Sequence, residues 1–293
     1  MTSTTPKTQR AVPRWLEPLV LLGPAGIWLL LLFVLPMGLI GLFSLVADLK
    51  PGALVNITGL QNYTQLFDPV NLRVMGQSLF LATCTTVICL ITGYPVAYWL
   101  TQKVPARWQK VLLLAFVLPL WTSSLLRTYA WITILRPTGV LNTFLNALRL
   151  PSLDLLYQLP AVLIGLVSSW LPFMVLILYA SLSKLDRRLL EAAADLGATP
   201  RQAFMQVTIP QTRAGIIAGA LLVFVNAIAD FVVPEVLGGA SSMTVPRLIF
   251  SRFLSSASNW GVGSAWSFLL ILVVSLMIVL LLKYGDRNAS KAL

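Results

Sequence analysis

Three charged side chains stand inside long apolar stretches of this sequence, where they could bind an ion: Arg127, Asp230 and Glu235. A charge inside a membrane costs about 2.5–3.5 kcal/mol on insertion scales, so each one calls for an explanation. Pro234 removes the backbone hydrogen bond to the Asp230 carbonyl, which brings carboxylate and free carbonyl oxygens together. Such an anionic site suits a di- or polyammonium ion. The other interpretation is an Arg127–Asp230 ion pair that holds two spans together, with Glu235 at the outer membrane boundary.

Three aromatic residues near Arg127 could contribute to a cation site. Trp121, Tyr129 and Trp131 carry rings whose faces attract cations, with about 0.5–2 kcal/mol for each contact. Rings of this kind are also typical of the aromatic belt at a membrane boundary and of helix packing. The sequence is compatible with both roles.

Several kinds of catalytic and metal site are excluded by composition. The chain has no histidine, which removes imidazole metal ligands and Ser–His nucleophile pairs. Cys84 and Cys89 are five residues apart in one apolar stretch, a spacing that does not stack on a helix, so we assign them to packing. No G-x-x-x-x-G-K-[ST] loop for nucleotide phosphates is present. We therefore expect no catalytic residue, metal ligand or cofactor in this chain.

The segment 184–213 contains a different signal, which begins with a short helix of defined length. Residues 191–196 (EAAADL) strongly favour helix, and Gly197 is placed to cap the C-terminal end. The helix is therefore expected to stop at a sharp turn.

A second short helix follows this turn. Thr199 can cap its N-terminus, Pro200 suits its first position, and Pro210 is expected to end it. Two compact helices with small residues and a projecting Glu191 form a shape that fits a groove in a partner protein.

The elements that position these residues follow from hydropathy. Hydrophobic residues make up 57% of the chain and charged residues 11%, whereas soluble domains have roughly 25% charged residues. A membrane-spanning helix needs about 20 mostly apolar residues. Six stretches meet this condition: 19–47, 78–100, 111–135, 160–182, 214–237 and 264–282. The sequence therefore predicts an all-α membrane protein with about six transmembrane helices.

Proline is present inside most of these stretches and predicts kinks, because it removes a helical hydrogen bond. The internal prolines are Pro36, Pro95, Pro119, Pro172 and Pro234. Several kinked helices together fit spans that line a cavity and move, although irregular packing would account for any single kink.

Charge placement predicts the orientation. The net charge is +11, and most lysine and arginine residues flank the spans on the N-terminal side of the membrane. The positive-inside rule then puts both termini in the cytoplasm, and the basic excess suits anionic lipids rather than nucleic acid. We expect a cytoplasmic segment at 1–18, a transmembrane domain at 19–283 that includes the loop 184–213, and a cytoplasmic tail at 284–293. The first stretch is longer than a signal-peptide core, so we expect a retained span, with a cleaved signal as the alternative.

The loop resembles the EAA loop of binding-protein-dependent ABC importer permeases. That pattern has Glu-Ala-Ala, three residues, Gly, nine residues and then Ile-x-Leu-Pro. With Val for Ile and Ile for Leu, the matching residues here are Glu191, Ala192, Ala193, Gly197 and 207–210, which ends in Pro210. The resemblance implies coupling helices that dock onto a separate ATPase subunit, which binds ATP and Mg²⁺. The alternative is an amphipathic helix that lies on the membrane.

Other segments resemble spermidine/putrescine permeases. They are 118–131, 139–142, 171–176 and 230–239, where Asp230 stands in place of the Glu expected in that family. The resemblance implies a permease subunit of the bacterial inner membrane that moves polyamines from a periplasmic binding protein to the cytoplasm by alternating access. It also implies two ATPase subunits and a second permease that completes a heterodimer.

The substrate pathway is then expected to use the intramembrane residues named first: Trp121, Arg127, Tyr129, Trp131, Asp230 and Glu235. A permease for ferric iron, an anion or a phosphonate is the alternative. A secondary transporter driven by an ion gradient belongs to another class, in which the paired helices of 184–213 would have no partner.

Overall fold

The computed structural model describes residues 23–24, 26–46, 49, 59–239, 242–255 and 258–286, and the regular structure of these residues is helical. The expected segment 1–18 and most of the expected tail 284–293 lie outside the described residues. The longest helices are α4 (Pro69–Gln102), α8 (Leu159–Leu182), α12 (Arg213–Ala229) and α15 (Trp260–Asp286). The shorter helices of the bundle are α2 (Leu35–Phe43), α3 (Gln61–Leu66), α5 (Ala106–Val117), α6 (Ser124–Leu135), α7 (Val140–Ala147), α13 (Val232–Leu237) and α14 (Val245–Leu254).

The number of spans agrees with the sequence. Four described helices are long and apolar enough to cross a membrane, and two bent helix pairs raise the number to six. The bent pairs are Ala106–Trp121 with Ser124–Ala147 at 91°, and Pro200–Gln211 with Arg213–Ala229 at 66°. The expectation of about six transmembrane helices is therefore confirmed, but two of them are sharply bent.

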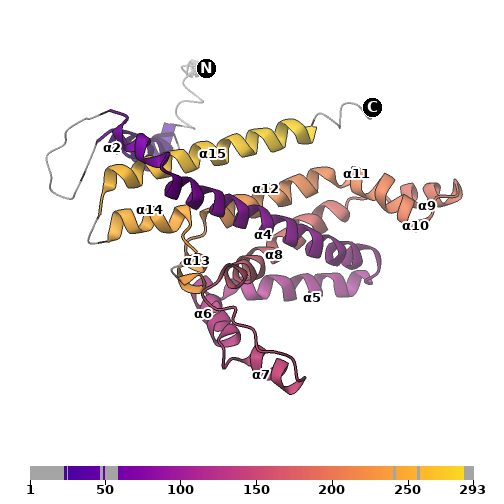
Figure 1. Cartoon of the computed structure of the whole chain (residues 1–293). Helices are drawn as coiled ribbons and strands as arrows, with labels where there is room; N and C mark the ends of the chain where they lie inside the picture. The colour runs from indigo at the N-terminus through magenta and orange to yellow at the C-terminus, as the bar shows by residue number, and fades with distance from the viewer. Residues whose placement is uncertain are drawn as a thin grey trace, which may run out of the picture.

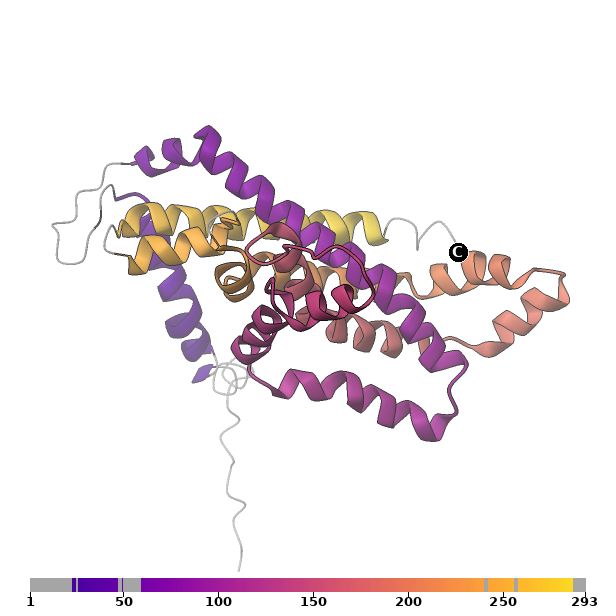
Figure 2. The same cartoon turned by 60° about the horizontal axis from the view of Figure 1, so that its bottom comes forward.

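The centre of the bundle is formed by α4, α8 and α12, which pack side by side (Figures 1 and 2). Small residues make this possible. A β-carbon built on Gly219 of α12 would lie 2.8 Å from the Met174 sulfur of α8, and one on Gly93 of α4 would lie 3.2 Å from Met174 Cγ. Close backbone approach through glycine is the usual basis of helix packing in membranes. Cys89 is fully buried in this centre, as the packing interpretation predicted.

The helix α4 is longer than the second apolar stretch, 78–100, from which it was predicted. It begins at Pro69, directly after Asp68, and continues through Pro95 to Gln102. At 1.5 Å for each residue its length is about 50 Å, whereas a bilayer core is about 30 Å thick. The first two turns therefore belong to the end of the bundle opposite α9 and α10, in a region that the sequence assigned to a loop.

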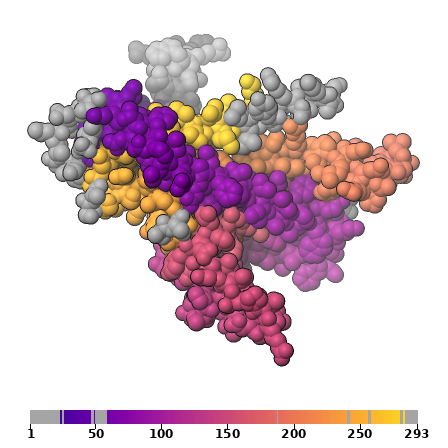
Figure 3. All heavy atoms as spheres, in the orientation of Figure 1, coloured from indigo at the N-terminus to yellow at the C-terminus, as the bar shows by residue number. Residues whose placement is uncertain are grey.

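The third stretch, 111–135, was predicted as one span with a proline kink, and the structure bends it far more sharply than a kink. The helix α5 passes into a 3₁₀ turn, η2 (Leu118–Trp121), that contains Pro119. Thr122 and Ser123 are extended, and the chain turns by 91° before α6. The pair α6 and α7 leaves the bundle sideways as a projection (Figures 1 and 3). Proline and two extended residues interrupt the helical hydrogen bonds, so the chain can change direction here.

The fifth stretch, 214–237, is also divided. The helix α12 ends at Ala229, Asp230 is extended, and α13 is a separate helix that packs on α6 and α8. Pro234 lies in the first turn of α13, where a missing N–H is tolerated. The predicted kink at Pro234 is therefore a helix end and a new helix start.

A buried hydroxyl connects distant parts of this architecture. Ser78 Oγ in α4 accepts a hydrogen bond of 2.8 Å from the backbone N–H of Val245, the first residue of α14. Ser78 and Val245 are both buried. The start of α14 is thus attached to α4 by one side chain.

Ser78→Ala should therefore lower the free energy of unfolding by about 1–3 kcal/mol, because the Val245 N–H stays buried without an acceptor. Thermal unfolding of the purified chain in detergent measures this. Thr92→Ala is the control, since the exposed Thr92 hydroxyl of the same helix donates to Ile88 in its own turn. Equal melting temperatures for the two variants would contradict this role of Ser78.

Candidate functional site

The first candidate site is the loop 184–213, whose first helix is α9 (Arg187–Asp195). The Asp186 carboxylate caps its N-terminus by accepting a hydrogen bond of 3.0 Å from the Arg188 N–H. At the other end Gly197 has φ +84°, a left-handed conformation that glycine adopts without steric cost. The N–H groups of Gly197 and Ala198 bond to the carbonyls of Ala194 and Ala193, which is the Schellman arrangement. The predicted cap at Gly197 is confirmed.

The second helix of the loop also begins as predicted. Thr199 caps α10 (Pro200–Ala203) in a capping box with Gln202, and Pro200 occupies the first turn. The helical path then continues through a π-helical turn, η3 (Phe204–Thr208), into α11 (Ile209–Gln211).

Pro210 was predicted to end this helix, but the helix ends one residue later, at Gln211. The wide η3 turn ends two residues before the proline, and the chain bends by 66° at Thr212, directly before α12 begins. Another π-helical turn, η1 (Leu30–Val34), likewise ends two residues before Pro36 in the first span. In both places the wider turn accommodates a residue that has no N–H to donate.

The loop projects from one end of the bundle (Figures 1 and 3). Glu191 and Ala192 are exposed, Ala193 is half-buried, and Leu196 at the tip is 89% exposed. The loop therefore exposes an apolar side chain beside a carboxylate on two capped helices. Leu196 was not singled out from the sequence, because an apolar residue in a short helix gives no sign of its direction.

The second candidate site lies at the breaks in the spans and contains Asp230. Its Oδ1 accepts hydrogen bonds from the N–H groups of Val232 (3.0 Å) and Val233 (3.2 Å). Asp230 therefore caps the N-terminus of α13. Arg127 of α6 is close enough to attract the same carboxylate, while the buried Nε1 of Trp170 in α8 has no hydrogen-bond partner.

Arg127 does not form the direct ion pair with Asp230 that one interpretation of the sequence required. Among the described residues, the ion pair with atoms within 4.0 Å joins Arg247 to Glu235. The Arg127 NH1 group donates instead to the Pro119 carbonyl at 2.7 Å, while its buried Nε has no hydrogen-bond partner. Arg127 thus holds the turn after α5 closed and acts on Asp230 from a distance.

Glu235 pairs with Arg247, a residue that the sequence did not single out. The Nε of Arg247 contacts the Glu235 carboxylate, and its NH1 group donates to the Gly239 carbonyl. The side chain of Glu235 is 43% exposed and that of Arg247 is 18% exposed. The pair joins α13 to α14 across a turn, and nothing local in the sequence indicates a partner at this distance.

The three aromatic candidates have different surroundings. Trp121 is 80% exposed at the break after η2, and Tyr129 is 54% exposed on α6. Trp131 is half-buried, and its Nε1 donates to the Ser168 hydroxyl of α8 at 2.9 Å. Trp131 therefore packs two helices together, while Trp121 and Tyr129 present free ring faces.

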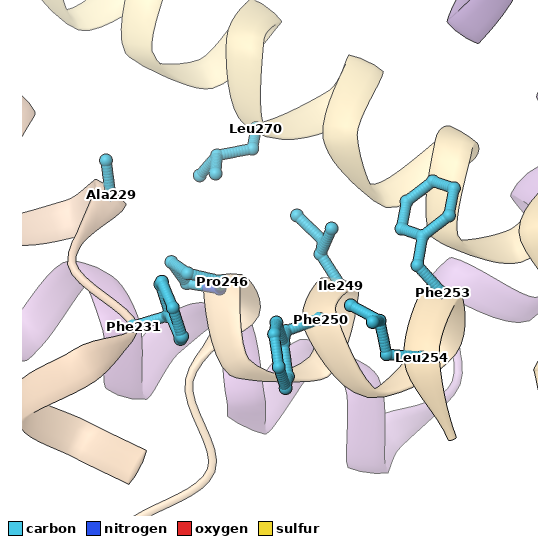
Figure 4. Close-up of a pocket in the computed structure, with 8 residues that line it drawn as sticks. All are labelled: Ala229, Phe231, Pro246, Ile249, Phe250, Phe253, Leu254 and Leu270. Carbon is cyan, nitrogen blue, oxygen red and sulfur yellow. The ribbon is translucent and has the colours of Figure 1, made fainter. Parts of the chain in front are cut away.

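An apolar hollow of about 460 Å³ lies beside this region, between α14, α15 and the start of α13 (Figure 4). Phe231 and Phe250 stack at its edge with centroids 5.0 Å apart. The residues that line it are Ala229, Phe231, Pro246, Ile249, Phe250, Phe253, Leu254 and Leu270. Because this lining carries no charge, the hollow by itself does not suit a hydrated cation.

Comparisons with known proteins agree with this geometry. Residues 93–287 match the family described as binding-protein-dependent transport system inner membrane component. The spermidine/putrescine transport system permease protein PotB of Haemophilus influenzae is 44% identical over 221 residues, which cover 75% of this chain and 77% of that protein. The protein of the same name from Escherichia coli is 40% identical over 255 residues, with 86% of this chain and 92% of that protein covered.

Solved structures show the same fold at lower identity. A chain of a bacterial ABC transporter involved in the import of the acidic polysaccharide alginate superposes with a TM-score of 0.76 at 20% identity. The match covers 93% of this chain and 96% of that one. A chain of the MetNI methionine ABC transporter gives a TM-score of 0.53 at 15% identity, with 80% of this chain and 99% of that chain covered.

The cap at Asp230 can be tested apart from its charge. Asp230→Ala should lower the free energy of unfolding by about 0.5–2 kcal/mol, whereas Asp230→Asn should keep it near the wild-type value, because asparagine caps equally well. Thermal unfolding in detergent measures both variants, with Asp154→Ala as a control for loss of an exposed acid. Equal stability of the Ala and Asn variants would show that the capping bonds contribute little.

Proposed function

This chain belongs to the family of binding-protein-dependent transport system inner membrane components, the permease subunits of ABC importers, and on that premise we propose that its substrates are polyamines. The observation that carries the proposal is the identity of 40–44% to two spermidine/putrescine permeases over most of the chain. The family match at residues 93–287 includes the broken spans, where the intramembrane acids lie.

The chemistry of the site supports a polycationic substrate. Asp230 and Glu235 are carboxylates near one helix break, and Trp121 and Tyr129 offer exposed ring faces. A cation that leaves water needs an opposite charge close by, since uncompensated burial costs several kcal/mol. In the structure the Arg247 guanidinium pairs with the Glu235 carboxylate. A substrate ammonium group would therefore replace Arg247 at Glu235, which exchanges one cation for another.

The partners follow from the family and from the loop. We propose two ATPase subunits that bind ATP and Mg²⁺, a second permease, and an extracytoplasmic binding protein. The loop 184–213 docks onto the ATPase, and nucleotide-driven movement of the loop switches the spans between outward and inward access. The C-terminal end of α15 and the start of α5 lie at the same end of the bundle as α9 and α10 (Figure 1), which supports a cytoplasmic location for that end.

Uptake by the complete importer in proteoliposomes tests the substrate. The expected result is ATP-dependent uptake of radiolabelled spermidine or putrescine. Unlabelled ferric iron, molybdate or phosphonate should not inhibit this uptake. Competition by one of these, with no polyamine uptake, would replace the proposed substrate.

Glu235→Gln should lower polyamine uptake at least about tenfold, which corresponds to a loss of roughly 1.4 kcal/mol of barrier stabilisation. Uptake is measured in the same proteoliposomes, and Asp154→Asn serves as a control that removes an exposed acid elsewhere. ATPase assembly should be unchanged, because α13, which contains Glu235, lies far from α9 and α10 (Figure 1).

The double variant Glu235→Gln with Arg247→Gln separates a transport role from a structural one. The single change leaves Arg247 without its partner, and the double change removes both charges. If the double variant regains both stability and uptake, Glu235 is a structural partner of Arg247. If it regains stability alone, the transport role stands.

Gly197→Val should prevent stable docking of the ATPase while membrane insertion stays intact. A β-branched residue cannot adopt φ +84° without steric cost, so the turn between α9 and α10 has to change. Co-purification of the ATPase from membranes measures docking. Gly197→Asn is the matched control, because asparagine tolerates this conformation. Normal co-purification and uptake by Gly197→Val would mean that the loop is only a connector.

A further inference from the structure

The loop 184–213 returns to the bundle through one aromatic side chain. Phe204, the first residue of η3, packs against two tyrosines of α4. Its ring centroid lies 5.6 Å from that of Tyr94 and 5.3 Å from that of Tyr98, with interplanar angles of 86° and 88°. Both contacts are edge-to-face, a geometry that aromatic rings prefer and that defines their relative orientation.

A buried hydrogen bond reinforces the same connection. The hydroxyl oxygens of Tyr94 and Thr212 are 2.8 Å apart, and both residues are buried. Thr212 Oγ1 donates its hydrogen to the Thr208 carbonyl at 2.8 Å, so Tyr94 is the donor to Thr212. Tyr94 thus contacts the loop twice, through its ring at Phe204 and through its hydroxyl at Thr212.

The hydrogen bond between Tyr94 and Thr212 joins two places where a helix is interrupted. Thr212 is at the 66° bend between α11 and α12. Pro95 follows Tyr94 inside α4, and a proline leaves the carbonyl four residues earlier, that of Ile91, without its helical donor. The helix α4 is therefore weakest directly beside the residue that contacts the loop.

We infer that Tyr94, Tyr98, Phe204 and Thr212 form the joint that transmits movement of the loop into α4. When the ATPase displaces α9 and α10, Phe204 pulls the tyrosines with it and α4 bends at Pro95. The surface of the loop binds the partner, whereas these four residues carry its movement into the membrane. The inference rests on the proposed function, since it assumes an ATPase on the loop.

The test uses the complete importer in proteoliposomes and measures polyamine uptake per ATP hydrolysed. Phe204→Ala should lower this ratio at least fivefold, while the ATPase still co-purifies and ATP is still hydrolysed. Phe204→Tyr keeps an aromatic ring and should retain most of the ratio. Phe80→Ala is the control, because it removes an exposed phenylalanine from the other half of α4.

Hydrogen exchange of the same complexes gives a readout that does not depend on the substrate. ATP with vanadate should change the protection of α4 amides around 91–99 in the wild type, and Phe204→Ala should abolish this change while leaving the change in α9 intact. An unaltered α4 response, an unaltered uptake ratio or loss of ATPase co-purification in Phe204→Ala would each overturn the joint. If the polyamine proposal is wrong, the wild type will show no polyamine uptake. The hydrogen exchange of α4 will then still test whether these four residues form the joint.

Discussion

Hydrocarbon offers no hydrogen-bond partner to a peptide group, so each break in a spanning helix has to find its partners within the protein. In this chain polar side chains supply them. After α5, Arg127 and Thr122 both donate to the Pro119 carbonyl. After α11, Thr212 donates to the Thr208 carbonyl, and after α12, Asp230 accepts from the first N–H groups of α13. The Asp230 bonds satisfy N–H groups that have no helical acceptor, and the other side chains add to the backbone hydrogen bonds that remain at the Pro119 and Thr208 carbonyls.

This constraint decides which charges remain available. Asp230 accepts from two N–H groups at the start of α13, so a ligand that withdrew it would leave them without this acceptor, whereas Arg127 shares the Pro119 carbonyl with Thr122. Glu235 is different, because its partner is the long side chain of Arg247 rather than the backbone. A substrate cation can take the place of that side chain without disturbing a helix. The pair between α13 and α14 is therefore better suited to exchange than Asp230.

The packing of the bundle determines how movement can pass through it. The helices α4, α8 and α12 approach closely at glycines such as Gly219, so they move together rather than slide apart. Weak points remain at Pro95 in α4 and at the bend before α12. The Tyr94–Thr212 hydrogen bond connects these two points, and the aromatic contacts of Phe204 join the loop to the same part of α4.

The sequence by itself determined the helical membrane architecture and the form of the loop, because hydropathy and helix caps depend on residues within one or two turns. The caps at Gly197 and Thr199 were predicted correctly for this reason. Only the tertiary structure decided the 91° turn after α5, the partner of Glu235 and the packing of Phe204 against Tyr94. Each of these depends on contacts between residues that are far apart in the sequence. A local sequence pattern does not indicate which of these residues the folded bundle brings together.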